Sequence, residues 1–105
     1  MKGIAMSFRA KYPTGKVEDI DEHELPEFQE GELITRCSIC DTLWFPDGTV
    51  VSGVPKEVAN KKYPVGKISD TYGSIECLNW LFKGETEKYV PRSKLSKLPD
   101  KCWLG

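Results

Sequence analysis

The pair Cys37-Ser38-Ile39-Cys40 is the feature that most constrains how this chain can fold. A two-residue spacer turns both thiolates toward one ion, and backbone amides of the same turn can donate hydrogen bonds to the sulfurs. Residues 33–36 and 42–45 are typical of strands that enter and leave such a turn. We therefore expect a metal knuckle between two strands.

A closed structural zinc site requires four ligands, and this chain has no second Cys-x2-Cys pair. Its other cysteines stand alone, 37 residues after Cys40 and 25 residues after that. We predict one structural zinc ion bound by four cysteines: Cys37, Cys40, Cys77 and Cys102. His23 or Asp70 could replace one of the two distant cysteines, Cys77 or Cys102.

Two other interpretations of the cysteines stay open. In the first, Cys77 and Cys102 are small buried apolar residues, and Cys37 and Cys40 are free thiols. In the second, Cys37 and Cys40 form a redox pair, which is the weakest interpretation because the strand-to-helix setting of a thioredoxin-type motif is missing.

Length and composition fit one small globular domain over residues 1–105. Hydrophobic residues make up 39% of the 105 positions and charged residues 30%, which is too apolar for general disorder. No apolar run approaches the roughly 20 residues of a membrane helix, and the N-terminus lacks the apolar core of a secretory signal. We expect a protein of the cytoplasm, of a bacterium or a host cell, with no membrane partner.

The acidic segment, residues 18–32, carries eight of the sixteen acidic residues and no Lys or Arg. It is a candidate for a mobile segment and for contact with a protein partner, since its field could attract a basic groove. Leu25 and Phe28 would add apolar anchors within it. The predicted partner-binding residues are Glu22, Glu24, Leu25, Glu27 and Phe28; the alternative is a solvated loop.

The C-terminal third supports a second candidate partner, nucleic acid. The net charge of −1 argues against a uniformly positive surface. Outside the acidic segment, however, fifteen basic residues face eight acidic ones, a net +7. Lysines and arginines near aromatic rings can bind a single strand by phosphate contact and stacking. The candidate residues are Arg92, Lys94 and Lys97.

The secondary-structure signals predict an α+β, mostly β domain with two hairpins, an N-terminal strand and one or two short helices. Residues 42–45 and 49–54 form the first expected hairpin, across Pro46-Asp47-Gly48, and residues 55–63 form a helix. Residues 74–82 are apolar on both faces; we favour a strand that pairs with residues 87–91 as the second hairpin. The expected core residues are Phe8, Leu43, Trp44, Phe45, Val50, Val51, Leu78, Trp80 and Phe82.

The sequence contains no motif that predicts an enzyme. His23, the single histidine, lies in the acidic segment without a nucleophile tied to it, and we expect an exposed loop residue there. A phosphate-binding glycine-rich loop, His-Glu-x-x-His and a nucleophile elbow are all missing.

Two short stretches resemble known families. Residues 35–81 are similar to a cysteine-rich segment found in small bacterial proteins and beside some bacterial sensor-kinase domains. The stretches that carry the resemblance are Cys37-Ser38-Ile39-Cys40, Ile68-Ser69-Asp70 and Cys77-Leu78. In this chain Asp70 stands where that segment has a histidine. Residues 76–95 resemble the terminal hairpin of small phage and bacterial domains, which ends in aromatic-x-Pro-Lys/Arg-Ser. These resemblances imply a non-enzymatic bacterial or phage accessory protein that binds another macromolecule. The alternative is a small zinc-ribbon-like nucleic-acid-binding protein.

Overall fold

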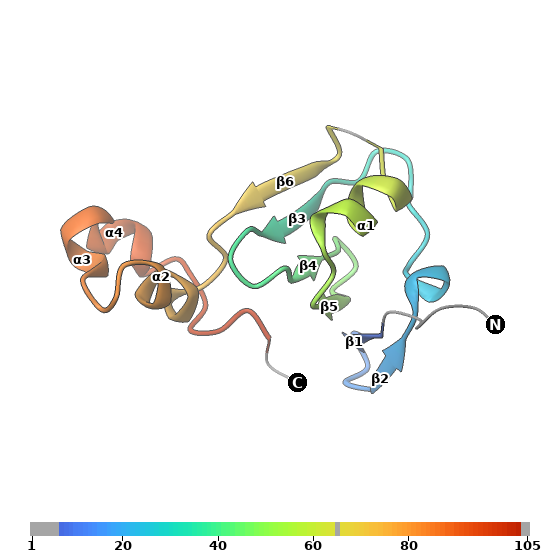
Figure 1. Cartoon of the computed structure of the whole chain (residues 1–105), viewed down its shortest axis with the longest axis horizontal. Coiled ribbons are helices and arrows are strands. Elements are labelled where there is room, and N and C mark those ends of the chain that lie inside the picture. The colour runs from blue at the N-terminus through green and yellow to red at the C-terminus, as the bar shows by residue number, and fades with distance from the viewer. Residues whose placement is uncertain (1–6, 65, 104–105) are drawn as a thin grey trace.

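The computed structural model describes residues 7–64 and 66–103 (Figure 1). It contains a six-stranded mixed sheet and short helices, which confirms the predicted α+β, mostly β class. The elements are β1 (Phe8–Lys11), β2 (Val17–Ile20), the 3-10 helix η1 (Glu22–Glu24), β3 (Ile34–Cys37), β4 (Leu43–Trp44), β5 (Val50–Ser52), α1 (Lys56–Lys62), β6 (Ile68–Thr71), α2 (Ile75–Leu81), α3 (Thr86–Tyr89) and α4 (Arg92–Leu95).

The sheet has the strand order β2-β1-β5-β4-β3-β6. All neighbouring strands are antiparallel except β3 and β6, which run parallel. A parallel pair needs a long crossover, and residues 38–67 supply one that contains β4, β5 and α1. This connection places the end of β6 beside the end of β3, so the chain leaves the sheet next to the cysteine knuckle.

The predicted first hairpin is confirmed as β4 and β5. Leu43 pairs with Val51 and Trp44 with Val50. The Asp47 carboxylate accepts a hydrogen bond from the Thr49 amide (2.8 Å), and Gly48 adopts φ 100°, a conformation that favours glycine.

The N-terminal strand prediction falls partly within the described residues, because β1 begins at Phe8 while residues 3–6 lie outside them. β1 pairs with β2 across a turn in which the Gly15 amide donates to the Tyr12 carbonyl (2.8 Å). β2 was not predicted, and it takes up the first residues of the acidic segment, so part of that segment is an ordered strand.

The main core lies on the sheet and under α1. It comprises Phe8, Ala10, Ile20, Leu25, Ile34, Leu43, Phe45, Val51, Val54, Val58, Ala59 and Tyr63. Tyr63, at the end of α1, packs its ring edge-on against Phe45 (centroids 5.7 Å apart) and donates its hydroxyl to the Pro26 carbonyl (2.6 Å). Pro26 is thereby fixed to the body of the domain, together with the acidic segment around it.

The predicted second hairpin is wrong. Residues 75–81 form α2, whose first turn is capped by the Ser74 hydroxyl, which accepts a hydrogen bond from the Cys77 amide (3.1 Å). A side-chain acceptor at this position satisfies a free amide of the first turn and favours a helix. The residues expected to be the partner strand form α3 instead.

The helices α2–α4 form a C-terminal arm (residues 74–98) that projects from the sheet along the 48 Å long axis of the molecule (Figure 1). Trp80 is 74% exposed there, so its assignment to the core is wrong, whereas Leu78 is buried. Phe82 is partly buried and stacks on Tyr89, with ring centroids 4.6 Å apart. The remaining predicted core residues are buried, except Trp44 and Val50, which are partly exposed.

The packing of the acidic segment generates the first prediction. Leu25 is 2% exposed within the main core, whereas Leu33 is 54% exposed. We expect Leu25→Ala to lower the free energy of unfolding by about 2–5 kcal/mol, because it removes buried methyl groups and leaves a cavity. Leu33→Ala is the matched control, with a change of less than about 0.5 kcal/mol. Urea unfolding followed by circular dichroism measures both; equal losses would contradict the observed packing.

Candidate metal centre

The knuckle is built at the end of β3. Cys37 is its last residue, and the chain turns through residues 38–41 before β4 begins. The Cys37 amide donates to the Thr42 carbonyl (2.9 Å), and the Asp41 amide donates to the Cys37 carbonyl (3.0 Å). Asp41 has φ 61°, which allows the sharp reversal. The predicted turn between two strands is therefore present, and its cysteines are compatible with a metal knuckle.

Two other segments bring their cysteines to the same point. Cys77 lies in the first turn of α2, and Cys102 lies in the C-terminal tail. The tail is tied to the start of α2, because the Ile75 and Glu76 amides donate to the carbonyls of Pro99 and Asp100 (both 3.0 Å). These bonds place Cys102 beside Cys77.

The four cysteine sulfurs lie within 4.8 Å of one another. Cys37 Sγ is 3.6 Å from Cys77 Sγ, which is 3.5 Å from Cys102 Sγ. Sulfurs bound to one tetrahedral ion at about 2.3 Å would be about 3.8 Å apart, so the donor set fits such an ion. The cluster unites all four cysteines selected from the sequence, and all four are free thiols.

The cluster is largely shielded from water. Cys37, Cys77 and Cys102 are buried and Cys40 is the most exposed of the four; Ile39 and Trp44 pack against the group. The Trp44 ring lies directly on Gly73, where an added Cβ atom would fall 1.9 Å from a ring carbon. Gly73 therefore permits the close approach of Trp44 to the segment that leads from β6 into α2.

The electrostatics of the site stabilise the thiolate of Cys37 and disfavour the thiolates of Cys77 and Cys102. Burial raises the pKa of Cys37, but backbone amides of Cys40, Gly73 and Ile39 donate hydrogen bonds to its sulfur, and the pKa falls to about 7. Burial raises the pKa of Cys77 to about 11 and also raises the pKa of Cys102. Several thiolates can share this volume only if a cation compensates their charge.

Arg36 stabilises the knuckle through ion pairs, and it was not among the site residues predicted from the sequence. Its buried guanidinium pairs with Asp41, where the knuckle ends, and its Nη1 lies 3.6 Å from Asp70 Oδ1 on β6. Arg36 thus links the knuckle to the strand that leads to Cys77. An arginine next to a Cys-x2-Cys pair was the available signal, but a single charged residue in a strand does not indicate its partners.

Neither alternative ligand lies in the cysteine cluster. Asp70 faces Arg36, and His23 lies on η1, where it lines a small cavity with Glu22, Lys61 and Lys62. In this arrangement neither His23 nor Asp70 can take the place of a cysteine as a metal ligand. His23 is exposed, as expected for a loop histidine.

The predicted partner-binding residues are only partly accessible. Leu25 is buried in the main core, so the prediction that it serves as an apolar anchor for a partner is wrong. Phe28 packs against the core and is partly exposed, so its role as an anchor stays a prediction. Glu24 and Glu27 are exposed, while Glu22 is partly exposed; Glu27 forms an ion pair with Lys62 (3.0 Å). Leu25 and Phe28, which were expected to contact a partner, attach the acidic segment to the main core.

The predicted nucleic-acid-binding residues lie on the C-terminal arm. Arg92 and Lys94 belong to α4, and Lys97 follows it. All three are exposed, although Arg92 Nε donates to Glu87 Oε1 (2.6 Å). The arm lies at the opposite end of the molecule from β2 and η1 of the acidic segment (Figure 1).

Comparisons with known proteins add no relative: no protein-family model matches the chain, and no curated protein or solved structure is significantly similar to it. The two resemblances therefore stay predictions. Among the described residues no helix is long and apolar enough to cross a membrane.

The contact between Gly73 and Trp44 generates the second prediction. Gly73→Ala should lower the free energy of unfolding by about 1–3 kcal/mol, because the new methyl group overlaps the indole. In a Trp44→Leu background the ring is gone, and the same substitution should cost much less. A double-mutant cycle measured by urea unfolding gives the coupling between the two positions; independent effects would contradict the contact.

Proposed function

We propose that this chain is a non-enzymatic binding module whose four cysteines hold one structural zinc ion. The observation that carries the proposal is the convergence of Cys37, Cys40, Cys77 and Cys102 within 4.8 Å. Four thiolates complete a tetrahedral coordination sphere and leave no position for a reacting water or substrate. Such an ion stabilises a fold and takes no part in a reaction.

The proposed role of zinc is to hold the arm on the sheet. The main core draws its buried residues from positions 8–63, and Ile68 packs against it. The second core cluster consists of Cys37, Cys77 and Cys102, with Ile39 and Trp44 around them. Because the arm contributes no residue to the main core, its attachment depends on this second cluster. Zinc would thus create the surface at which sheet and arm meet.

Metal analysis gives the third prediction. Native mass spectrometry of the purified protein should show one zinc ion per chain, and Cys77→Ser should lose it, because a hydroxyl is a poor replacement for a thiolate ligand. Ser38→Ala changes the knuckle but leaves all four cysteines in place; it is the matched control and should retain the metal. Cobalt substitution provides a second measurement, since tetrahedral thiolate coordination gives intense visible bands. A metal-free protein, or a reddish one that contains iron, would contradict the proposal.

The division into two clusters gives the fourth prediction. Removal of zinc by a chelator should accelerate amide hydrogen exchange of α2 and residues 99–103 by several orders of magnitude. The amides of β1, β2 and β5 should stay protected, because the main core holds them without the cysteines. Exchange resolved by mass spectrometry of peptides measures both regions. Uniform loss of protection, or no change in α2, would contradict the proposed role of the ion.

A second candidate function is protein binding through the acidic segment. Among the described residues, Asp21, Glu22, Glu24, Glu30 and Glu32 form no ion pair. Asp21 and Glu24 accept hydrogen bonds from backbone amides at the cap of η1, and Glu24, Glu30 and Glu32 are exposed. A rigid acidic surface of this kind favours association with a basic protein partner. The double substitution Glu22→Lys and Glu30→Lys should then abolish co-purification of that partner. Glu57→Lys with Glu76→Lys is the matched control, and equal losses would count against this function.

A further inference from the structure

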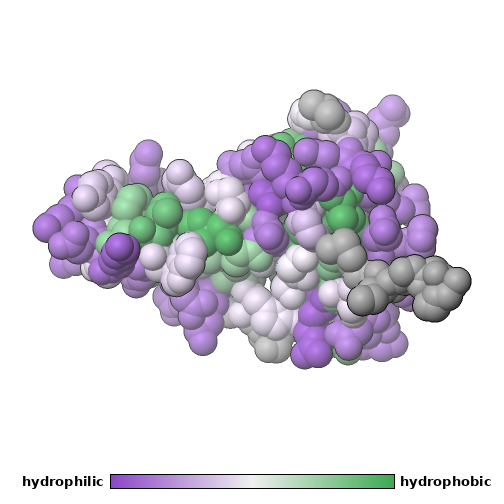
Figure 2. Space-filling view, viewed as in Figure 1, coloured by the Kyte–Doolittle hydropathy of each residue, from purple (hydrophilic) through white to green (hydrophobic). Residues whose placement is uncertain are grey.

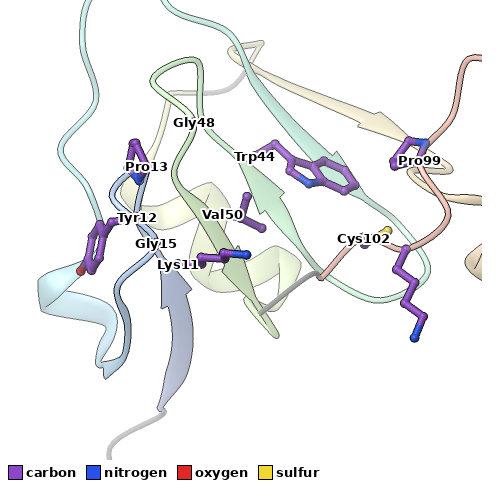
Figure 3. A pocket seen from close by; sticks show the side chains of 10 residues that line it. Lys11, Tyr12, Pro13, Gly15, Trp44, Gly48, Val50, Pro99 and Cys102 are labelled. Carbon is purple, nitrogen blue, oxygen red and sulfur yellow. The ribbon is translucent and has the colours of Figure 1, made fainter.

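A row of three hollows follows the junction between the sheet and the C-terminal arm. The first has a volume of about 360 Å³ and is lined by Tyr12, Trp44, Pro99 and Lys101, among others. Figure 3 shows the Trp44 indole between the Val50 side chain and the Pro99 ring. Pro99 and Trp44 also line the second hollow, of about 370 Å³. The first and second hollows are therefore neighbours that share Trp44 and Pro99.

The row continues onto the arm. Thr71 and Leu98 line both the second hollow and the third, which has a volume of about 350 Å³. The third hollow is lined further by Tyr72, Tyr89 and Lys94. Figure 2 shows apolar side chains gathered over this part of the molecule, bordered by hydrophilic ones. We name the three hollows together the junction groove.

Aromatic rings recur along the junction groove. Tyr12 and Trp44 lie at its first part, and Tyr72 and Tyr89 lie at its last part. Tyr72 is 50% exposed and Tyr89 is 63% exposed, so both rings are accessible. Stacking of Tyr89 on Phe82 fixes its ring from one side, with an interplanar angle of 20°. Accessible rings in a row are the platform on which successive bases stack in single-strand-binding proteins.

The charge of the junction groove is positive. Lys11, Lys101 and Lys94 line it, and the described lining residues include no aspartate or glutamate. The acidic segment would repel a nucleic acid. One of its residues, Glu18, accepts a hydrogen bond from the Tyr12 hydroxyl at the first hollow (2.9 Å), whereas the arm lies at the opposite end of the long axis from β2 and η1 (Figure 1). The electrostatic objection to a nucleic-acid ligand is therefore weakest at the third hollow, on the arm.

We propose that single-stranded nucleic acid binds along the junction groove, with bases on the aromatic rings and phosphates on the lysines. An apolar peptide would use the rings but offer no anion to Lys94 and Lys101. The inference rests on the proposed function, because zinc at Cys77 and Cys102 would hold the two walls of the junction groove together.

The test uses the zinc-loaded full chain and a fluorescent oligothymidylate of about 12 nucleotides, within the site sizes of single-strand-binding folds. Fluorescence anisotropy should show binding at low salt. Lys94 and Lys101, neutralising two phosphates, predict a slope of about −1.4 for log affinity against log salt. Affinity should therefore fall by about seven-fold between roughly 50 and 200 mM salt.

Matched variants locate the site. Lys101→Ala and Lys94→Ala should each reduce the salt slope by about 0.7, and Tyr89→Ala should weaken binding by about ten-fold or more. Trp80→Ala and Lys61→Ala are the controls, because Trp80 is an exposed aromatic residue of the arm and Lys61 an exposed lysine of α1, both outside the junction groove. Both controls should bind as the unmodified chain does, and native mass spectra of every variant should show zinc.

The outcomes separate this inference from the zinc proposal. A zinc-loaded chain that does not bind the oligonucleotide, or that binds it equally well in the groove variants, overturns the inference and leaves the zinc proposal standing. Salt-insensitive capture of an apolar peptide with no oligonucleotide binding also overturns it, in favour of a peptide ligand. A chain that contains no zinc contradicts the proposed function first, whatever it binds.

Discussion

Four cysteine sulfurs from three distant segments must be held at one point, and the arrangement of the whole C-terminal half depends on it. Gathering them closes chain loops of 36 and 24 residues, at a cost in conformational entropy that grows only slowly with loop length. The sulfurs gain little from one another, because burial disfavours the thiolates of Cys77 and Cys102. A divalent ion bound to all four cysteines would offset this cost and the loss of entropy together.

The division of the core explains where such an ion matters. The sheet and α1 bury a continuous apolar cluster, which includes the acidic segment through Leu25. The arm has short helices of four to seven residues, which are marginal without tertiary support. It meets the sheet at the sulfurs and at Trp44, whose ring also lines the junction groove. The candidate metal site, the second core cluster and the candidate binding surface thus all include contacts of Trp44.

The sequence was most informative where a local pattern leaves few alternatives. The Cys37–Cys40 spacer predicted the knuckle, Pro46-Asp47-Gly48 the first hairpin and Pro55 the start of α1, and each has one dominant local cause. Residues 74–82 were misassigned because apolar residues on both faces fit a buried strand as well as a helix. Ser74 is a typical helix N-cap residue and was a signal for a helix, but the apolar pattern of residues 74–82 was given more weight. The burial of Leu25 could not be read from a charged segment, since it depends on Tyr63 and Pro26 meeting across 37 residues.

The separation of charge along the molecule also follows from the fold. Antiparallel pairing of β1 with β2 and the cap of η1 by Asp21 hold the acidic segment at one end. The parallel pair β3–β6 sends the chain out at the other end, where the basic arm begins. A net charge of −1 therefore conceals two surfaces of opposite sign on a body 48 Å long. Because the Debye length is about 8 Å at physiological ionic strength, a ligand at the third hollow responds to Lys94 and little to the carboxylates of the acidic segment at the far end.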